Sequence, residues 1–174
     1  MDISIAPYTT VPDRPALEAL LVAYYEIMIE KWARAGGPPI NTDTMMSGLW
    51  DDIDRFLPPH GALTLAHDPD GTLLGCGFLK KIRPDAAELK RLFVIPEAQG
   101  YGLGRKLIDA RIEIARNMGV RDFYADTIKG NDSMLSLYAK LGFSFIEHYP
   151  ENANPKDWSP WLVYLHRTID PLPV

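Results

Sequence analysis

The feature that most constrains the fold is a glycine-rich turn between a predicted strand and a predicted helix. Residues 88–95 end in the β-branched and aromatic run Phe93-Val94-Ile95 and stop at Pro96, which is typical of a strand. After the turn, apolar residues recur with helical spacing as far as Gly119, which ends the predicted helix. The rest of the chain is expected to be organised around this strand, turn and helix.

The helical spacing places one broad apolar face of the predicted helix against the core. This face consists of Leu103, Leu107, Ala110, Ile114 and Met118, flanked by Ile108 and Ala115. Arg111 interrupts the face, and we expect its guanidinium to extend to the rim of the core or to meet a carboxylate. Ile112 falls outside the face.

The turn itself, Gln99-Gly100-Tyr101-Gly102-Leu103-Gly104, has three glycines on alternate positions. Such glycines allow the backbone to approach a ligand closely, and the amides of the following helical turn attract an anion. The turn therefore favours diphosphate binding. A tight strand-to-helix turn that binds no ligand is the alternative.

Two common phosphate-binding patterns do not fit this turn. The nucleotide-triphosphate loop ends in Gly-Lys-Ser/Thr, whereas Gly104 is followed by Arg105. The dinucleotide pattern needs another glycine three residues after its second one, and neither glycine pair here meets that spacing. The pattern Q/R-x-x-G-x-G/A does fit, through Gln99, Gly102 and Gly104. At these residues the chain resembles the GNAT superfamily of acyl-CoA-dependent N-acyltransferases.

A second stretch supports the resemblance. Residues 131–143 are similar to the second signature of that family, in which an Asn precedes a short helix ending in Leu-Tyr-x-Lys-x-Gly-Phe. Met134 departs from the pattern, because the family usually has a small residue there, and this affects how a pantetheine arm packs on the helix. The resemblance covers residues 60–169, whereas the first sixty residues match only in coarse pattern.

The resemblance implies an α/β (α+β) domain with the GNAT fold: a mixed, mostly antiparallel seven-stranded sheet, a parallel and splayed central strand pair, and about four flanking helices. The sequence pattern agrees, since a helical crossover separates the two central strands. Strands are expected at 3–6, 61–66, 72–82, 88–95, 123–127, 143–149 and 161–168. Helices are expected at 13–35, 42–57, 102–119 and 133–141, with Thr42 or Asp43 capping the second and Asn131 or Asp132 the fourth.

Composition limits the class of protein. A chain of 174 residues, 47% hydrophobic and 24% charged, predicts one globular domain over residues 1–174. No apolar run approaches the ~18 residues of a membrane span, and the acidic start lacks the basic region of a signal peptide. With one cysteine and a net charge of −5, we expect a cytoplasmic protein without nucleic acid or membrane partners. A homodimer is left open.

Cysteine and histidine do not indicate a reactive or metal centre. Cys76 lies between two glycines in a predicted strand, which favours a structural thiol over a nucleophile. The histidines show no metal-ligand spacing, so no metal is expected. His148 and His166, on the last predicted hairpin, are candidates for the acceptor side of a site.

Acyl transfer from a thioester to an amine requires an unprotonated nitrogen, a stabilised oxyanion and a proton for the thiolate. By resemblance, Tyr138 protonates the CoA thiolate; an ordinary core tyrosine is the alternative. Glu88 lies where some family members carry a glutamate that draws the amine's proton through water. By the two-residue period it shares a face with Lys90, Leu92 and Val94, and a surface ion pair with Lys90 is the alternative role.

The resemblance also implies the site of the co-substrate, acetyl-CoA. Its pantetheine is expected to pair like an added strand with residues 92–94, and the N–H of Val94 is expected to meet the oxyanion. Asn131 resembles the residue that bonds pantetheine, although a helix cap also explains it. The expected co-substrate residues are Leu92, Phe93, Val94, Gln99, Gly100, Tyr101, Gly102, Leu103, Gly104, Arg105, Asn131 and Tyr138.

The expected acceptor is the primary amine of a small molecule, such as an amino acid, a polyamine or another amino-bearing metabolite. Acceptor contacts are expected from the first two helices and the loop before the last strand. These carry Trp32, Met45, Met46, Trp50, Trp158 and Trp161, with Glu26, Glu30, Asp43 and Asp51 beside them. The alternative makes the aromatics core and the acids a solvated helix face. Two other functions stay open: a non-catalytic acyl-CoA sensor, and an acetyltransferase acting on protein or peptide amines.

Overall fold

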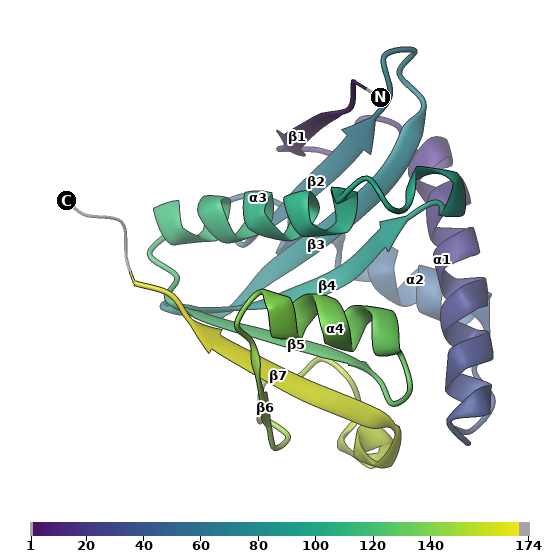
Figure 1. Cartoon of the computed structure of the whole chain (residues 1–174), viewed down its shortest axis with the longest axis vertical. Helices are drawn as coiled ribbons and strands as arrows, with labels where there is room; N and C mark the ends of the chain where they lie inside the picture. Colours follow the sequence, from purple (N-terminus) through teal and green to yellow (C-terminus); the bar gives the residue numbers. More distant parts are fainter. Residues whose placement is uncertain (1, 171–174) are drawn as a thin grey trace.

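Seven strands form one mixed sheet in the computed structural model, which describes residues 2–170 (Figure 1). The spatial order is β1-β2-β3-β4-β5-β7-β6, and the central pair β4 and β5 runs parallel while the other neighbours are antiparallel. The expected fold class is therefore confirmed. The strands are β1 Ser4–Tyr8, β2 Gly61–His67, β3 Leu73–Arg83, β4 Ala86–Val94, β5 Asp122–Ile128, β6 Ser144–Ile146 and β7 Leu162–Thr168.

Helices cover both faces of the sheet. The α-helices are α1 Arg14–Arg34, α2 Thr42–Asp51, α3 Leu103–Asn117 and α4 Asp132–Lys140, and short 3-10 turns lie at Ile53–Phe56, Pro96–Ala98 and Lys156–Trp161. Within residues 2–170, none of these helices combines the length and the apolar character that crossing a membrane requires.

The cap predicted for α2 was wrong by one residue. Asn41, and neither Thr42 nor Asp43, is the N-cap, because its side-chain oxygen accepts the N–H of Thr44 at 2.9 Å. The backbone of Asn41 is still extended, as a capping residue requires, and Thr42 is already helical.

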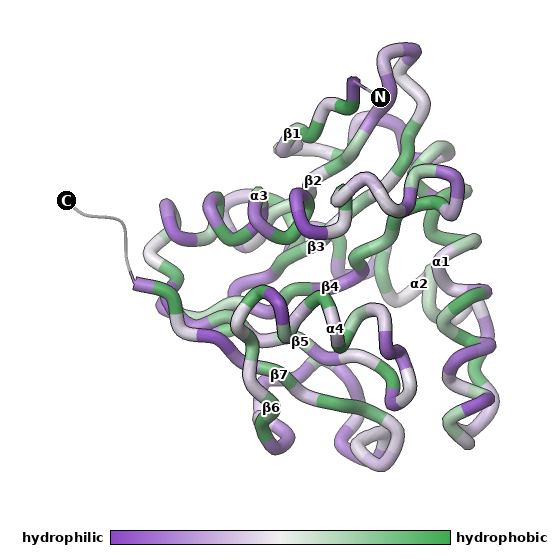
Figure 2. Tube along the Cα trace, in the orientation of Figure 1, coloured by the Kyte–Doolittle hydropathy of each residue, from purple (hydrophilic) through white to green (hydrophobic). Residues whose placement is uncertain are grey.

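The core has one layer on each side of the sheet. On one face, α3 and α4 pack against β4 and β5 through residues such as Leu89, Ile108 and Leu141. On the other face, α1 and α2 pack against β3 and β4 through Leu21 and Phe78. Figure 2 shows the matching pattern in α3, where hydrophilic and hydrophobic residues alternate along the helix.

The predicted last hairpin is present as β6 and β7, but its first strand is shorter than predicted. The strand expected over 143–149 is only Ser144–Ile146. Residues beyond it leave the sheet because Tyr149 packs into an aromatic cluster, its ring centroid 4.6 Å from that of Tyr124 and 5.9 Å from that of Tyr164. The loop that follows is thereby directed across the ends of β4 and β5.

Candidate active site

The parallel pairing of β4 and β5 is short. It joins residues 86–89 to residues 122–125 and stops there, so the two strands diverge towards α1 (Figure 1). At the same point β4 contains a bulge, where Arg91 has a φ of 47° and the register with β3 shifts by one residue. The expected splay of the central strands is present.

The bulge reverses which face of the sheet the later residues of β4 occupy. Glu88 and Lys90 lie opposite Lys80 and Phe78, on the face covered by α1. Leu92 and Val94 instead pack with Leu103 and Leu107 of α3. The expectation that Glu88 shares a face with Leu92 and Val94 was therefore wrong, because one extra residue breaks the two-residue period.

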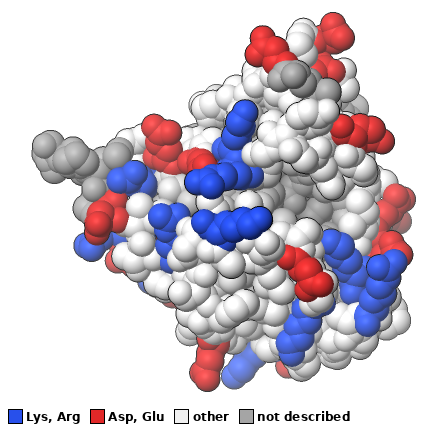
Figure 3. Space-filling view, in the orientation of Figure 1, with Lys and Arg blue, Asp and Glu red and all other residues white. Residues whose placement is uncertain are grey.

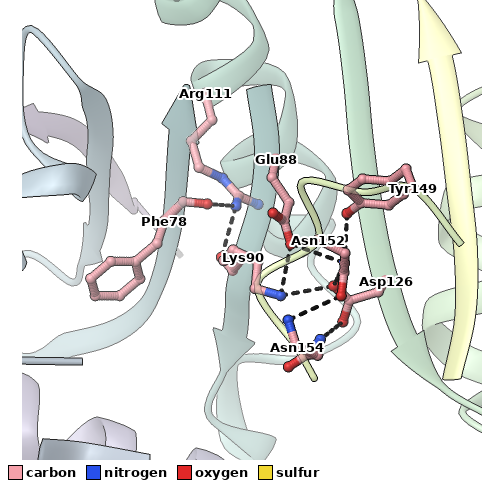
Figure 4. Close-up of polar contacts among 8 residues, drawn as sticks. All are labelled: Phe78, Glu88, Lys90, Arg111, Asp126, Tyr149, Asn152 and Asn154. Atoms are coloured by element: carbon pink, nitrogen blue, oxygen red, sulfur yellow. Dashed lines mark hydrogen bonds and ion pairs between the residues drawn. The ribbon is translucent and has the colours of Figure 1, made fainter. Parts of the chain in front are cut away.

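The side chain of Arg111 in α3 bonds backbone carbonyls beside the bulge in β4. This side chain is fully buried and donates hydrogen bonds to the carbonyls of Phe78 in β3 and Lys90 in β4 (Figure 4). It also donates to the carbonyl of Leu107 in its own helix. A Cβ at Gly77 would lie 2.5 Å from its Nε, so the strand must have glycine there. The guanidinium neither reaches the rim nor meets a carboxylate, contrary to expectation, because the bulge offers it unpaired carbonyls instead.

Ile112, the next residue of α3, also differs from its prediction. It is only 7% exposed and belongs to the same core cluster as Leu89 and Ile108. The sheet and α4 together cover a wider arc of α3 than one helical face.

Two cavities meet where β4 and β5 diverge. One, which we call the glycine-turn cavity, measures about 370 Å³. The other, the aromatic cavity, measures about 130 Å³. They share the wall residues Tyr24, Met28, Leu92, Asn131 and Met134.

The glycine-turn cavity contains most of the residues predicted for the co-substrate. Gly100 and Gly102 have φ values of 85° and 74°, which other residues rarely adopt, and Gly102 is the N-cap of α3 without a side-chain capping bond. The first amides of α3 are thus available at the cavity. Figure 3 shows lysine and arginine side chains over α3, beside a hollow bounded by α1 and α4. The predicted residues that line it are Leu92, Phe93, Val94, Gln99, Gly100, Gly102, Leu103, Gly104, Arg105 and Asn131.

One residue of the predicted turn lies elsewhere. Tyr101 is 58% exposed and lines neither cavity. Its neighbour Gln99 donates from its side chain to the carbonyl of Val94 at 2.9 Å, which ties the turn to the end of β4.

The N–H of Val94 faces the opening between the strands. The N–H of Ile95 donates to the carbonyl of Leu74, on the β3 side. Since successive amides of a strand point in opposite directions, the N–H of Val94 points away from β3. An amide in this position is available to a ligand that enters between β4 and β5.

Asn131 links the two cavities and is held by polar contacts. It occupies the N-cap position of α4, yet its side chain makes no capping bond. Its Nδ2 donates to Thr127 Oγ1 at 2.9 Å, and its Oδ1 accepts from Lys31 Nζ at 2.7 Å. A capping role therefore does not explain this side chain.

Tyr138 lies beneath the meeting point of the cavities. It is 3% exposed, packs edge-on against Phe143, and lines the aromatic cavity. Burial raises the pKa of Tyr138 to about 12, and the nearby charge of Arg111 opposes that rise. The phenol is therefore protonated at neutral pH and can supply a proton.

A buried acidic network borders the aromatic cavity on the α1 face. Lys90 Nζ lies 2.7 Å from Asp126 Oδ2 and 3.0 Å from Glu88 Oε1. Asn152 bridges both carboxylates, at 2.8 Å and 3.2 Å, and Asn154 donates to Asp126 Oδ1 at 3.0 Å (Figure 4). Glu88 is fully buried and its Oε2 has no partner within the described residues. Its pairing with Lys90 is therefore real, but it is not a surface ion pair.

Lys90 and Asp126 form an ionised pair at neutral pH. Burial by itself lowers the pKa of Lys90, but the charges of Asp126 and Glu88 outweigh it and hold that pKa above its usual value. Burial raises the pKa of Asp126, but the charge and hydrogen bond of Lys90 outweigh it and keep that pKa below its usual range.

The walls of the aromatic cavity come from the elements expected for an acceptor. Trp32 of α1, Met45 of α2 and Trp158 of the last loop line it, whereas Met46, Trp50 and Trp161 do not. The four acids expected beside these residues are exposed and line neither cavity: Glu26, Glu30, Asp43 and Asp51. For these acids the solvated alternative holds, and Asp126 is the carboxylate that lines the cavity.

Cys76 and the two candidate histidines lie away from the cavity walls. Cys76 is fully buried, and burial raises the pKa of its thiol to about 12, as suits a structural residue. His166 bonds Asp122 at 2.8 Å, and His148 stacks near Tyr149. Among residues 2–170, no group of three or more His, Cys, Asp or Glu side chains is placed to bind a metal ion.

Four residues of the site were not predicted from the sequence: Arg91, Asp126, Asn152 and Asn154. Asp126 carries the one available signal, an acidic residue near the carboxyl end of a predicted parallel strand, where ligands commonly bind. The two asparagines lie in a loop whose path depends on the aromatic packing of Tyr149.

The Acetyltransferase (GNAT) family model matches residues 21–143. An uncharacterized N-acetyltransferase of Schizosaccharomyces pombe is 28% identical over 132 residues, which are 75% of this chain and 81% of that protein. Another from Escherichia coli is 30% identical over 145 residues, 80% of this chain and 81% of that protein.

A solved structure shares the fold. The GNAT family acetyltransferase from Elizabethkingia anophelis with acetyl-CoA bound is 20% identical, with a TM-score of 0.61 over 96% of this chain and 98% of that one. Because the family model covers more than half of the residues, the chain belongs to the GNAT family of acetyltransferases and is an acyltransferase enzyme.

Proposed function

We propose that this protein is an N-acetyltransferase that transfers an acetyl group from acetyl-CoA to the primary amine of a small molecule, by direct attack in a ternary complex. The observation that carries the proposal is the meeting of two cavities at the divergence of β4 and β5, beside Tyr138. The glycine-turn cavity takes the co-substrate and the aromatic cavity takes the acceptor. The related structure with acetyl-CoA bound supports this choice of co-substrate.

The residues of the glycine-turn cavity suit a diphosphate and a pantetheine arm. Backbone amides at the start of α3 face an anion, and Arg105 lies beside them on the cavity wall. The N–H of Val94 donates to the negative charge that develops on the reacting carbonyl oxygen. Asn131, held by Thr127 and Lys31, bonds the pantetheine.

Two proton transfers accompany the reaction. The amine nitrogen attacks the thioester carbon, a C–N bond forms and the C–S bond breaks, and Tyr138 gives its proton to the departing thiolate. The proton lost by the amine passes to the carboxylate pair Glu88 and Asp126. Asp126 lines the cavity, Glu88 lies behind it, and Lys90 pairs with both carboxylates.

The proposal is tested by mixing the purified protein and acetyl-CoA with a panel of small primary amines and with basic peptides, and following free thiol. Saturable turnover on small amines is expected, because the aromatic cavity is the size of one compact group. Turnover confined to the peptides would overturn the choice of acceptor. Acetyl-CoA binding without turnover on any amine would favour a non-catalytic sensor.

Gly104→Val is expected to weaken acetyl-CoA binding by tenfold or more, or about 1.4 kcal/mol. A Cβ here would sit 3.5 Å from Leu137 Cδ2 and 3.9 Å from Leu92 Cδ2, so the fold accepts it, but a branched side chain takes space from the ligand. Calorimetry on the folded variant measures the loss. Gly104→Ala is the matched control and should retain most of the affinity. Unchanged affinity in the valine variant would mean that the diphosphate binds elsewhere.

Glu88→Gln is expected to move the acid limb of the profile of kcat/KM against pH, and to lower the rate at neutral pH about tenfold or more. The change removes one of the two carboxylates that share Lys90. Glu113→Gln, at an exposed site on α3, is the control. An unaltered profile would assign proton removal to Asp126 alone or to water.

A further inference from the structure

A cation on the wall of the aromatic cavity has no carboxylate partner. Arg91 lines this cavity and not the glycine-turn cavity. Its Nε donates to Tyr25 Oη at 2.9 Å, and its guanidinium carbon lies 5.0 Å from the ring centroid of Phe56. Its Nη1 is buried without a hydrogen-bond partner, and no acidic side chain of residues 2–170 forms an ion pair with it.

An unpaired buried donor on a charged group is costly, and it calls for an explanation. Arg91 also has a positive φ of 47°, which is unfavourable for a side chain with a Cβ. The fold therefore holds this arginine in a strained position with part of its guanidinium unused. The positive φ belongs to the bulge, and the unpaired donor is explained if an anion binds there during function.

The charges around the cavity indicate what kind of anion this is. Lys90 and Arg91 carry two positive charges, and Glu88 and Asp126 carry two negative ones, but Lys90 is bonded to both acids. An acceptor whose only charged group is its ammonium would pair with Asp126 and leave Arg91 without an anion. A molecule that carries an amine and a carboxylate would satisfy both ends. Arg91 and Asp126 both line the aromatic cavity, so the two ends of such a molecule can be bound within it.

The remaining walls indicate the size and polarity of the rest of the acceptor. They are aromatic and aliphatic, formed by Tyr24, Tyr25, Met28, Trp32, Ile40 and Trp158. A volume of about 130 Å³ is close to that of an apolar cavity of roughly 150 Å³ known to hold benzene. One ring or a branched aliphatic group fits this space.

We propose that the acceptor is a free amino acid with an apolar side chain, whose carboxylate binds Arg91 and whose amine faces Asp126. This inference rests on the proposed function and narrows its acceptor from primary amines in general to one class. The apolar side chain occupies the space between α1 and the last loop. Arg91 thereby sets specificity and takes no part in the proton transfers.

The wild-type enzyme is tested with three acceptors that differ only at the carboxylate: L-phenylalanine, L-phenylalaninamide and 2-phenylethylamine. Thiol release with saturating acetyl-CoA gives kcat/KM for each. We expect kcat/KM for L-phenylalanine to exceed that of both analogues without a carboxylate by tenfold or more. Glycine, which lacks the apolar side chain, is expected to be a poor acceptor.

Arg91→Met is expected to lower the ratio of kcat/KM for L-phenylalanine over 2-phenylethylamine by tenfold or more, mainly through KM of the amino acid. Methionine is no more strained at this φ than arginine, since neither is β-branched. Arg91→Lys keeps the charge and should retain part of the ratio. Arg34→Met, at an exposed position on α1, is the matched control and should leave the ratio unchanged.

A binding measurement keeps the test independent of how well the variants fold. With CoA present, wild-type protein should bind N-acetyl-L-phenylalanine more tightly than N-acetyl-2-phenylethylamine by calorimetry. Turnover on amines without any preference for the carboxylate would overturn the amino-acid acceptor and leave the proposed function standing. Absence of acetyl transfer to every small amine would overturn both.

Discussion

Replacing Tyr138 with phenylalanine is expected to lower kcat about 10²-fold or more while acetyl-CoA affinity stays nearly unchanged. The change removes one hydroxyl from a ring that is 3% exposed and packed edge-on against Phe143, so the packing persists. What is lost is the proton donor for the departing thiolate. Steady-state kinetics give kcat, and calorimetry gives the affinity.

The pH dependence gives this prediction a second readout. Since burial raises the pKa of Tyr138 to about 12, the phenol stays protonated from acid through neutral pH. The limb of the wild-type profile on the acid side therefore reports the carboxylates. Tyr138→Phe should scale the profile down without moving that limb.

A matched control separates the loss of a proton donor from the loss of a hydroxyl in general. Tyr8→Phe makes the same change on β1, at a residue that lines neither cavity. It should leave kcat unchanged. If Tyr138→Phe also left kcat unchanged, Tyr138 would be an ordinary core residue.

Local sequence was sufficient to predict the order of helices and strands and the glycine turn. Gly100, Gly102 and Gly119 mark positions of positive φ, and the spacing of apolar residues in α3 is a short-range signal. The parallel pairing of β4 and β5 followed from the crossover between them. These features depend on residues that are neighbours in the chain.

The bulge in β4 could not be predicted from the sequence. Nothing in Lys90-Arg91-Leu92 marks it, since no glycine or proline is present, and Arg91 adopts its positive φ only within the folded sheet. This one extra residue reverses the face of the sheet on which each later residue of β4 lies. The same bulge exposes the carbonyls that Arg111 pairs with, so the error about Arg111 has the same origin.

The acidic network was missed because its members lie far apart in the chain. Lys90 and Asp126 are separated by 36 residues, and Asn152 and Glu88 by 64. The acids on α1 and α2 were predicted to contact the acceptor because they lie close to aromatic residues in the sequence. Helical geometry turns those acids to solvent while the tryptophan at position 32 faces inward.

Replacing Lys90 with methionine is expected to lower the free energy of unfolding by about 3 to 5 kcal/mol at pH 7. The change leaves Glu88 and Asp126 buried without their cation, and methionine offers a similar length but no charge. Urea denaturation of both proteins measures the difference. A matched variant that also carries Glu88→Gln and Asp126→Asn removes every charge of the network and should recover much of the loss.

The sign of the pH dependence distinguishes this cause from a packing defect. In the wild type the lowered pKa of Asp126 contributes stability above its unfolded value of about 3.9, and that contribution is lost only as pH falls through the lower folded value. In Lys90→Met, burial without a cation raises the folded pKa values of both acids, so its stability falls as pH rises. The difference between the two proteins should therefore shrink between pH 7 and about pH 5 as the variant's acids take up protons. A difference that stays constant across this range would indicate lost packing. A difference below 1 kcal/mol at pH 7 would contradict the buried ion pair.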